Sequence, residues 1–203
     1  MIQKFLNIIR HYRESDERDP DSWVLFCKKQ KTLYEAIYVA SMAINHLGNR
    51  HPHQFRLMKS DLRNFENSLA KQEKLIGTIK SFEDLFQIVK CAKVHGIGEL
   101  AIYDTAHRLG AFLNIFPEKI YLHSGTLVGA TKLIGKINSR VITKQDLPEP
   151  FKSSDLTCME LEDILCIYKR RFWGSFRQHG WPISPRCLLH FVTEYYTLRR
   201  QVY

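Results

Sequence analysis

Two helical patterns meet at Val94-His95-Gly96-Ile97-Gly98-Glu99-Leu100-Ala101, near the middle of a chain of 203 residues. Two glycines this close together predict a tight turn, because glycine adopts positive φ values and lets other groups approach its backbone. Ile97, between them, is expected to point inward and hold the turn against the core. The stretch therefore predicts a helical hairpin over about 81–113, in which the first helix ends at His95-Gly96 and the second runs from Glu99 to about Leu113.

Apolar residues on both sides of the hairpin recur at the spacing of helices rather than strands. Helices are expected over about 2–13, 32–46, 60–76, 124–135 and 157–168, with a last one from Ser184 and a loop over 138–153. Ser81 and Thr157 are expected to cap helices, each with an acid three residues later. The expected inner faces are Ile2, Phe5, Leu6 and Ile9 in the first helix, Leu62, Phe65, Leu69 and Ile76 in the charged helix, and Phe82, Leu85, Phe86 and Val89 before the turn. The sequence predicts an all-α, two-lobed protein, with residues 1–203 forming a single helical unit.

Charge and composition narrow the class of partner. Lys and Arg exceed Asp and Glu by 30 to 21, which gives a formal charge of +9, and 44% of the residues are hydrophobic. The hydrophobic fraction suffices for a core, and the positive charge favours nucleic acid over an anionic membrane surface. No apolar stretch is long enough to span a bilayer, and polar residues interrupt the N-terminal apolar run, which argues against a signal peptide. Five cysteines without a CxxC pair exclude a zinc ribbon and predict reduced, mostly buried thiols in a cytoplasmic protein.

The hairpin also has a chemical interpretation. The N–H groups at the start of its second helix, together with the helix dipole, suit a phosphate. Such a contact reads no base edge, so DNA binding through His95, Gly96, Ile97 and Gly98 is expected to tolerate any sequence. In the simpler alternative, the two glycines only end one helix and relax the turn. Glu99, an acid beside the phosphate site, is then an ordinary partner of the helix dipole.

The apolar residue before Gly-x-Gly and the small residues after it resemble the helix-hairpin-helix motif. A chain of this length with the motif near its centre resembles the helix-hairpin-helix DNA glycosylases, with some specificity over residues 80–135. The resemblance implies that a base leaves the duplex and enters a cleft between two helical lobes. Some members carry a lysine where this chain has Leu100, and nearly all carry an aspartate at the start of the next helix, where residues 118–126 have none. The resemblance then implies that water releases the base without strand cutting, and it leaves Glu118 and His123 as the titratable residues of that loop.

A second resemblance is to an uncharacterised group of bacterial hairpin proteins. It rests on Arg50-His51-Pro52-His53-Gln54, on Gly96-Ile97-Gly98-Glu99-Leu100 through Tyr103-Asp104-Thr105-Ala106, and on Tyr121-Leu122-His123-Ser124-Gly125-Thr126. This resemblance implies no activity.

Asp104 is the first candidate for chemistry. It follows Leu100 by one turn and shares a helix face with Leu100, Tyr103, His107 and Ala111, away from the expected core stripe of Ile102, Ala106, Leu109 and Leu113. A carboxylate there is expected to activate water or to stabilise positive charge on the sugar. Alternatively, Asp104 pairs with Arg108 on a solvated face. His123 either orients water or contacts phosphate, or it only caps or packs against the next helix.

Polar segments elsewhere supply the remaining expected contacts. Arg50, His51, His53 and Arg56 are expected to contact phosphate, as are Lys169, Arg170 and Arg171. Phe172 and Trp173 either stack on bases or close the core. No metal is expected, since neither carboxylate nor cysteine spacing supports a three-His site of His51, His53 and His123. No cofactor is expected either.

Two functions remain open for a protein whose expected partner is double-stranded DNA. One is a glycosylase acting on a modified or damaged base, because such a base is the easiest to unstack. The other is a non-enzymatic, sequence-tolerant DNA-binding module. A water-filled cleft faced by Asp104 and His123 would favour the enzyme, and a filled interface would favour the module.

Overall fold

Helices dominate the computed structural model, which describes residues 1–18 and 21–172. The α-helices are α1 (Ile2–Arg13), α2 (Ser22–Lys28), α3 (Leu33–Met42), α4 (Lys59–Ala70), α5 (Glu73–Ile76), α6 (Phe82–Cys91), α7 (Glu99–Leu113), α8 (Ser124–Ile134) and α9 (Cys158–Ile167). Short 3-10 helices are η1 (Asp16–Arg18), η2 (Pro52–Gln54) and η3 (Lys144–Asp146). The strands in these residues, β1 (Ile120–Tyr121) and β2 (Val141–Ile142), form one antiparallel pair. The all-α prediction is confirmed, while Trp173 and the helix expected from Ser184 lie outside the described residues.

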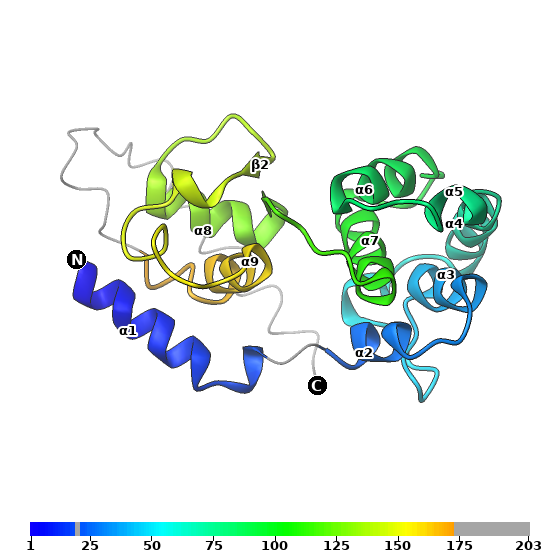
Figure 1. Ribbon diagram of the computed structural model, residues 1–203, viewed down its shortest axis with the longest axis horizontal. Helices are drawn as coiled ribbons and strands as arrows, with labels where there is room; N and C mark the ends of the chain where they lie inside the picture. Colours follow the sequence, from blue (N-terminus) through cyan, green and yellow to red (C-terminus); the bar gives the residue numbers. More distant parts are fainter. Residues whose placement is uncertain (19–20, 173–203) are drawn as a thin grey trace.

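Two hydrophobic clusters divide the molecule into two lobes (Figure 1). Helices α2 to α7 form the first lobe, and α1, the β1–β2 pair, α8 and α9 form the second. The chain starts in the second lobe, crosses to the first before α2, and returns after α7. Residues that are distant in sequence therefore meet at the junction of the lobes.

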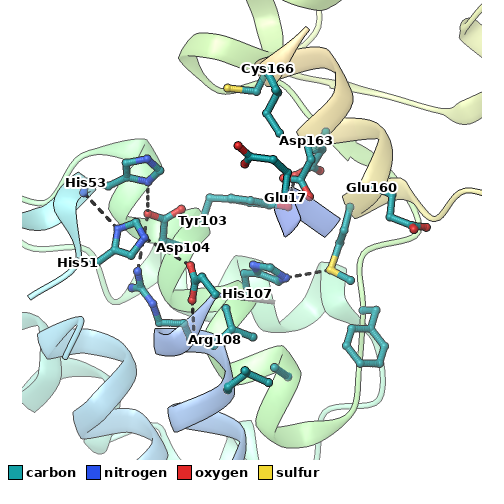
Figure 2. Close-up of a pocket in the computed structure, with 18 of the residues that line it drawn as sticks. Glu17, His51, His53, Tyr103, Asp104, His107, Arg108, Glu160, Asp163 and Cys166 are labelled. Carbon is teal, nitrogen blue, oxygen red and sulfur yellow. Dashed lines mark hydrogen bonds and ion pairs between the residues drawn. The ribbon is translucent and has the colours of Figure 1, made fainter. Parts of the chain in front are cut away.

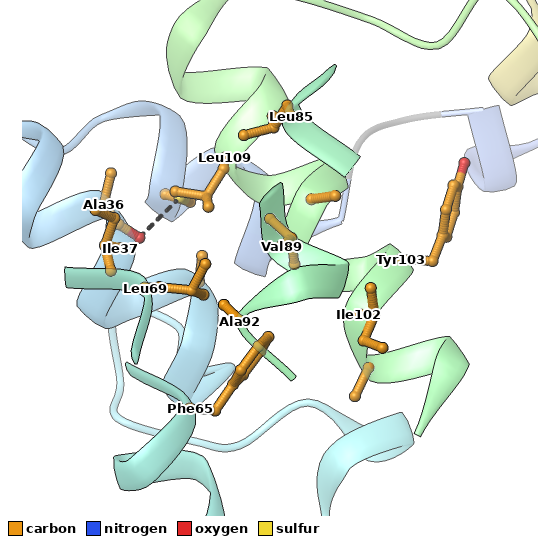
Figure 3. Packing of buried hydrophobic residues seen from close by; sticks show 14 of the residues in the cluster. Ala36, Ile37, Phe65, Leu69, Leu85, Val89, Ala92, Ile102, Tyr103 and Leu109 are labelled. Atoms are coloured by element: carbon orange, nitrogen blue, oxygen red, sulfur yellow. Dashed lines mark hydrogen bonds between the residues drawn. The ribbon is translucent and has the colours of Figure 1, made fainter. Parts of the chain in front are cut away.

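Helix α7 is the centre of the first lobe, because α2, α3 and α6 all pack against it. Figure 3 shows apolar side chains from α3, α4, α6 and α7 filling the space between these helices. Leu62, Phe65, Leu69 and Ile76 are all fully buried, as expected, but the single helix expected over 60–76 is divided, because α4 ends at Ala70 and Ile76 belongs to α5.

The turn between α6 and α7 depends on one glycine rather than two. Gly96 has a φ of +82°, and a Cβ there would lie 2.1 Å from Oδ2 of Asp61, so no other residue fits without movement. Gly98 precedes α7 with an ordinary φ of −89° and open space around it. Ile97 is buried, as expected. Helix α6 ends earlier than expected, at Cys91, and residues 92–98 form the turn.

Several expected elements differ in detail. The inner face of α1 is Phe5, Ile8, Ile9 and Tyr12, while Ile2 and Leu6 are exposed, because contacts with the second lobe select that face. Helix α3 stops at Met42, since Ala43 adopts a left-handed conformation, rather than at 46. Helix α2 was not expected; Asp21 caps it by accepting a hydrogen bond from the N–H of Val24. Both β2 and η3 fall in the segment expected to be a loop.

Two further findings concern burial and hydropathy. Four cysteines in the described residues are free thiols; Cys27 is buried, Cys91 is exposed, and Cys158 and Cys166 are half-buried. The expectation of mostly buried thiols is therefore wrong.

None of the helices within residues 1–18 and 21–172 has the length and hydropathy of a membrane-spanning segment.

Candidate functional site

A cavity of about 870 Å³ lies where the two lobes meet. Its walls come from α7 and α2 of the first lobe, the η2 loop, and η1 and α9 of the second lobe. Figure 2 shows His51, His53 and Asp104 on one side and Glu17, Asp163 and Cys166 on the other. The cavity therefore separates two groups of polar side chains that belong to different lobes.

Helix α7 presents the predicted face to this cavity. Tyr103, Asp104, His107 and Ala111 all line it, whereas Leu100 does not. The helical period places Asp104, His107 and Ala111 opposite the core residues Ile102, Ala106 and Leu109, whereas Tyr103 lies at the edge of this face and also packs in the core of the first lobe.

Asp104 is held by three nitrogen-bearing side chains. Its Oδ2 lies 3.0 Å from Nδ1 of His53, accepts a 2.6 Å hydrogen bond from Gln54, and lies 3.9 Å from the guanidinium of Arg108. Burial alone would raise the pKa of Asp104, but the hydrogen bond from His53, the charge of Arg108 and the hydrogen bond from Gln54 lower this pKa below its usual value. Asp104 is therefore an ionised carboxylate in a largely enclosed position.

Arg108 is not on a solvated face, which corrects one of the two sequence-based alternatives. Its side chain is only 2% exposed and donates hydrogen bonds to Gln54 and to the backbone oxygen of Ala40. The η2 loop and α3 supply these two acceptors, and the sequence gives no sign that they approach α7. The pair of Arg108 and Asp104 is thus buried between elements that lie far apart in the chain.

The η2 loop brings both histidines to α7. Nδ1 of His51 accepts a hydrogen bond from the backbone N–H of His53, so His51 caps η2. The proton of a neutral His51 then sits on Nε2, which lies 3.4 Å from Oδ2 of Asp21. His51 is buried, and its ring packs edge-on against Trp23. This arrangement fixes the position of His53 beside Asp104.

His51, His53 and Asp104 have the donor types of a metal site, with ligand atoms within 4.8 Å of one another. Their hydrogen bonds argue against that use. Nε2 of His51 would have to lose its proton while Nδ1 still accepts the backbone N–H, and Oδ2 of Asp104 already accepts from Gln54. The Arg108 charge 3.9 Å away would also repel a cation. The cluster is therefore a hydrogen-bonded network of one carboxylate and two imidazoles.

His123 is the residue just before α8 and lines the cavity. Its ring centroid lies 5.2 Å from that of Tyr103, and its Nε2 lies 3.5 Å from the hydroxyl of Thr126. Burial lowers the pKa of His123, so the ring is neutral at neutral pH. Glu118 is exposed and does not line the cavity. Of the three acid–base candidates from the sequence, the structure thus brings Asp104 and His123 to one site and leaves Glu118 outside it.

Glu162 on α9 was not expected from the sequence. It accepts hydrogen bonds from the hydroxyl of Tyr103 and, at 2.7 Å, from the backbone N–H of Tyr121. Burial raises the pKa of Glu162 to about 8. The sequence gives no clear signal for it, because Glu162 is one of three acids in α9, with Glu160 and Asp163 beside it. Glu162 connects α7 of the first lobe with α9 of the second.

The expected DNA-contacting residues fall into two groups. His95, Gly96, Gly98, His53, Arg170 and Arg171 are exposed. Ile97 and His51 are buried, Arg50 donates to the backbone oxygen of Leu57, and Lys169 donates to that of Cys166. Phe172 is fully buried in the core of the second lobe, so it closes the core and does not stack on a base.

The cavity is acidic although the whole chain is basic. Seven acidic side chains line it: Asp16, Glu17, Asp21, Asp104, Glu160, Glu162 and Asp163. Glu162 is the one that stays protonated at neutral pH, because its pKa is about 8. Lysine and arginine contribute only Lys28 and Arg108 to the described lining.

Comparisons with protein-family models, curated proteins and solved structures found no match. The chemistry of this site is therefore the basis on which a function is assigned.

Proposed function

We propose that the protein binds duplex DNA and releases a modified or damaged base that has entered the cavity between its lobes. The observation that carries this proposal is the junction of the lobes. It holds an open cavity of about 870 Å³ whose lining includes both Asp104 and His123. A filled interface would favour a non-enzymatic DNA-binding module instead.

Charge supports a division of labour between the cavity and the outer surface. Phosphates are repelled by the carboxylates of the cavity, so a nucleotide enters with its base and sugar while the DNA backbone stays outside. The hairpin turn offers a place for that backbone, because Gly98 is exposed and no side chain caps the first N–H groups of α7. Tyr103 and His107 provide ring surfaces inside the cavity.

Release of the base is a hydrolysis. Water attacks C1′ of the sugar, the bond from C1′ to the base nitrogen breaks, and its electron pair leaves with the base. One proton of the water is lost to the enzyme, and the base gains a proton. Asp104 is the carboxylate on which this chemistry depends. Leu100 offers no amine for a Schiff base, so the product is an abasic site in an intact strand.

The test uses duplexes that each carry one alkylated, deaminated or oxidised base, scored for abasic sites by alkaline cleavage. Wild-type protein is expected to release at least one of these bases. Asp104→Asn is expected to lower the rate by about 10²–10⁴-fold while duplex affinity is retained. Asp155→Asn, an exposed position outside the cavity, is the matched control.

Three results would contradict parts of this proposal. No release from any duplex, with binding intact, would leave only the DNA-binding module. Full activity in Asp104→Asn would remove that residue from the reaction. A covalent complex trapped by borohydride would show that an amine, rather than water, attacks the sugar.

A further inference from the structure

The contact of His53 with Asp104 determines where a proton sits on the histidine ring. Asp104 is ionised, so its Oδ2 only accepts hydrogen bonds. Nδ1 of His53, at 3.0 Å from that oxygen, must therefore carry a proton and donate it (Figure 2). In the neutral ring, Nε2 then has no proton and a free lone pair. No residue in the part of the chain that the structure describes hydrogen-bonds this nitrogen.

His53 and Asp104 also differ in how exposed their side chains are. The side chain of Asp104 is 14% exposed, whereas that of His53 is 51% exposed, and both line the cavity. Asp104 also accepts a hydrogen bond from Gln54 and lies beside the positive charge of Arg108, and both contacts make its carboxylate a weak base. Of the two, His53 is the group that water reaches more easily.

The charges around His53 come from four elements. Asp104 and Arg108 lie on α7, Asp21 precedes α2, His51 belongs to the η2 loop, and His123 precedes α8. The hydrogen bond to Asp104 raises the pKa of His53 and outweighs burial and the Arg108 charge, which lower it. A histidine with a raised pKa is a stronger base once it has lost its proton.

We propose that His53 is the catalytic base of this site and that Asp104 is a positioning residue that acts through it. This inference rests on the proposed function. Nε2 of His53 takes a proton from water as the water oxygen bonds to C1′, and the departing base keeps the electron pair of the broken bond. His53 then returns the proton to the solvent or to the base. Asp104 holds the ring in the required tautomer and stabilises the imidazolium that forms.

The first test compares His53→Gln with His46→Gln in single-turnover base release and in duplex binding. His46 is exposed and lies outside the cavity, so it is a matched control. His53→Gln is expected to lower the rate at least about 100-fold with duplex affinity retained, while His46→Gln leaves both unchanged. The wild-type rate is expected to rise with pH through the pKa of His53, and this rise should be absent in the variant.

The second test does not require activity. Long-range proton–nitrogen correlation spectra of the full chain report the tautomer and the pKa of each histidine. They are expected to show the proton of neutral His53 on Nδ1, and a pKa that falls when Asp104 is replaced by Asn. If His53 had a purely structural role, its tautomer would be the same, but the rate of base release would not follow the pKa measured for His53.

The outcomes distinguish the two levels of the proposal. An active wild type together with an active His53→Gln overturns the role of His53 and leaves the proposed function standing. A proton on Nε2 of His53 overturns the inference whatever the activity. A wild type that releases no base from any duplex overturns the proposed function, and the role of His53 falls with it.

Discussion

At the residue scale, the two glycines of the hairpin turn have different physical requirements. Gly96 is held at positive φ against Asp61, whereas Gly98 has an ordinary backbone and open space around it. A side chain at 96 therefore conflicts with the protein itself. A side chain at 98 would meet only a ligand.

This difference predicts opposite results for one substitution at two positions. Gly96→Val is expected to lower the free energy of unfolding by about 2 kcal/mol or more, because a β-branched residue is strained at positive φ. Gly98→Val is expected to cost less than about 1 kcal/mol, and yet to weaken duplex binding. Denaturant unfolding and fluorescence anisotropy with a labelled duplex measure the two effects. If Gly98→Val binds as tightly as wild type, the turn is not the phosphate site.

At the scale of elements, Glu162 joins three segments that carry the site. It links Tyr103 of α7 to the backbone of β1, and β1 leads directly to His123 and α8. The same carboxyl group therefore sets how α9 and α7 approach each other. Its raised pKa of about 8 means that the folded protein keeps it protonated in a pH range where the unfolded chain does not.

This link predicts a dependence of stability on pH. Between the ordinary pKa of 4.5 and the folded value of about 8, the folded state holds a proton that the unfolded state has lost. The contribution of Glu162 to stability therefore falls as pH rises through this range, with a limiting slope of about 1.4 kcal/mol per pH unit. Glu162→Gln should remove this slope, and Glu118→Gln, at an exposed site, should keep it. If the free energy of unfolding falls with pH equally steeply in wild type and in Glu162→Gln, the assignment is wrong.

At the scale of the whole molecule, charge is distributed unevenly. The chain carries a formal charge of +9, yet carboxylates dominate the lining of the cavity between the lobes. A polyanion is attracted to the molecule as a whole and repelled by the cavity. Duplex affinity should accordingly fall with salt, with a slope of about −0.9 in log K against log salt for each phosphate neutralised.

The acidic cavity also predicts which substrates react fastest. A base that carries positive charge, such as an N-alkylated purine, is expected to be released faster than a neutral deaminated purine in the same duplex context. Replacing Glu17 and Asp163, two cavity carboxylates, by Gln and Asn should reduce this preference. Single-turnover rates on the matched duplexes measure it. Faster release of the neutral base by wild type would show that the cavity charge does not select the substrate.

The sequence by itself determined the elements whose signals are local. Helical periodicity predicted the bounds of α1 and α7, and cap residues placed the start of α6 and α9. The same periodicity identified Tyr103, Asp104, His107 and Ala111 as one face of α7. These features depend on patterns among residues three to eight positions apart in the sequence, so they can be predicted without knowing how distant elements pack.

Only the tertiary structure decided which partners meet that face. Asp104 contacts His53 across 51 positions of sequence, and Tyr103 contacts Glu162 across 59. No local pattern encodes such pairs, because they depend on how the η2 loop and α9 pack against α7. For the same reason the sequence left a solvated pair of Asp104 and Arg108 open as an alternative, whereas packing of distant elements buries Arg108 and makes it part of the site.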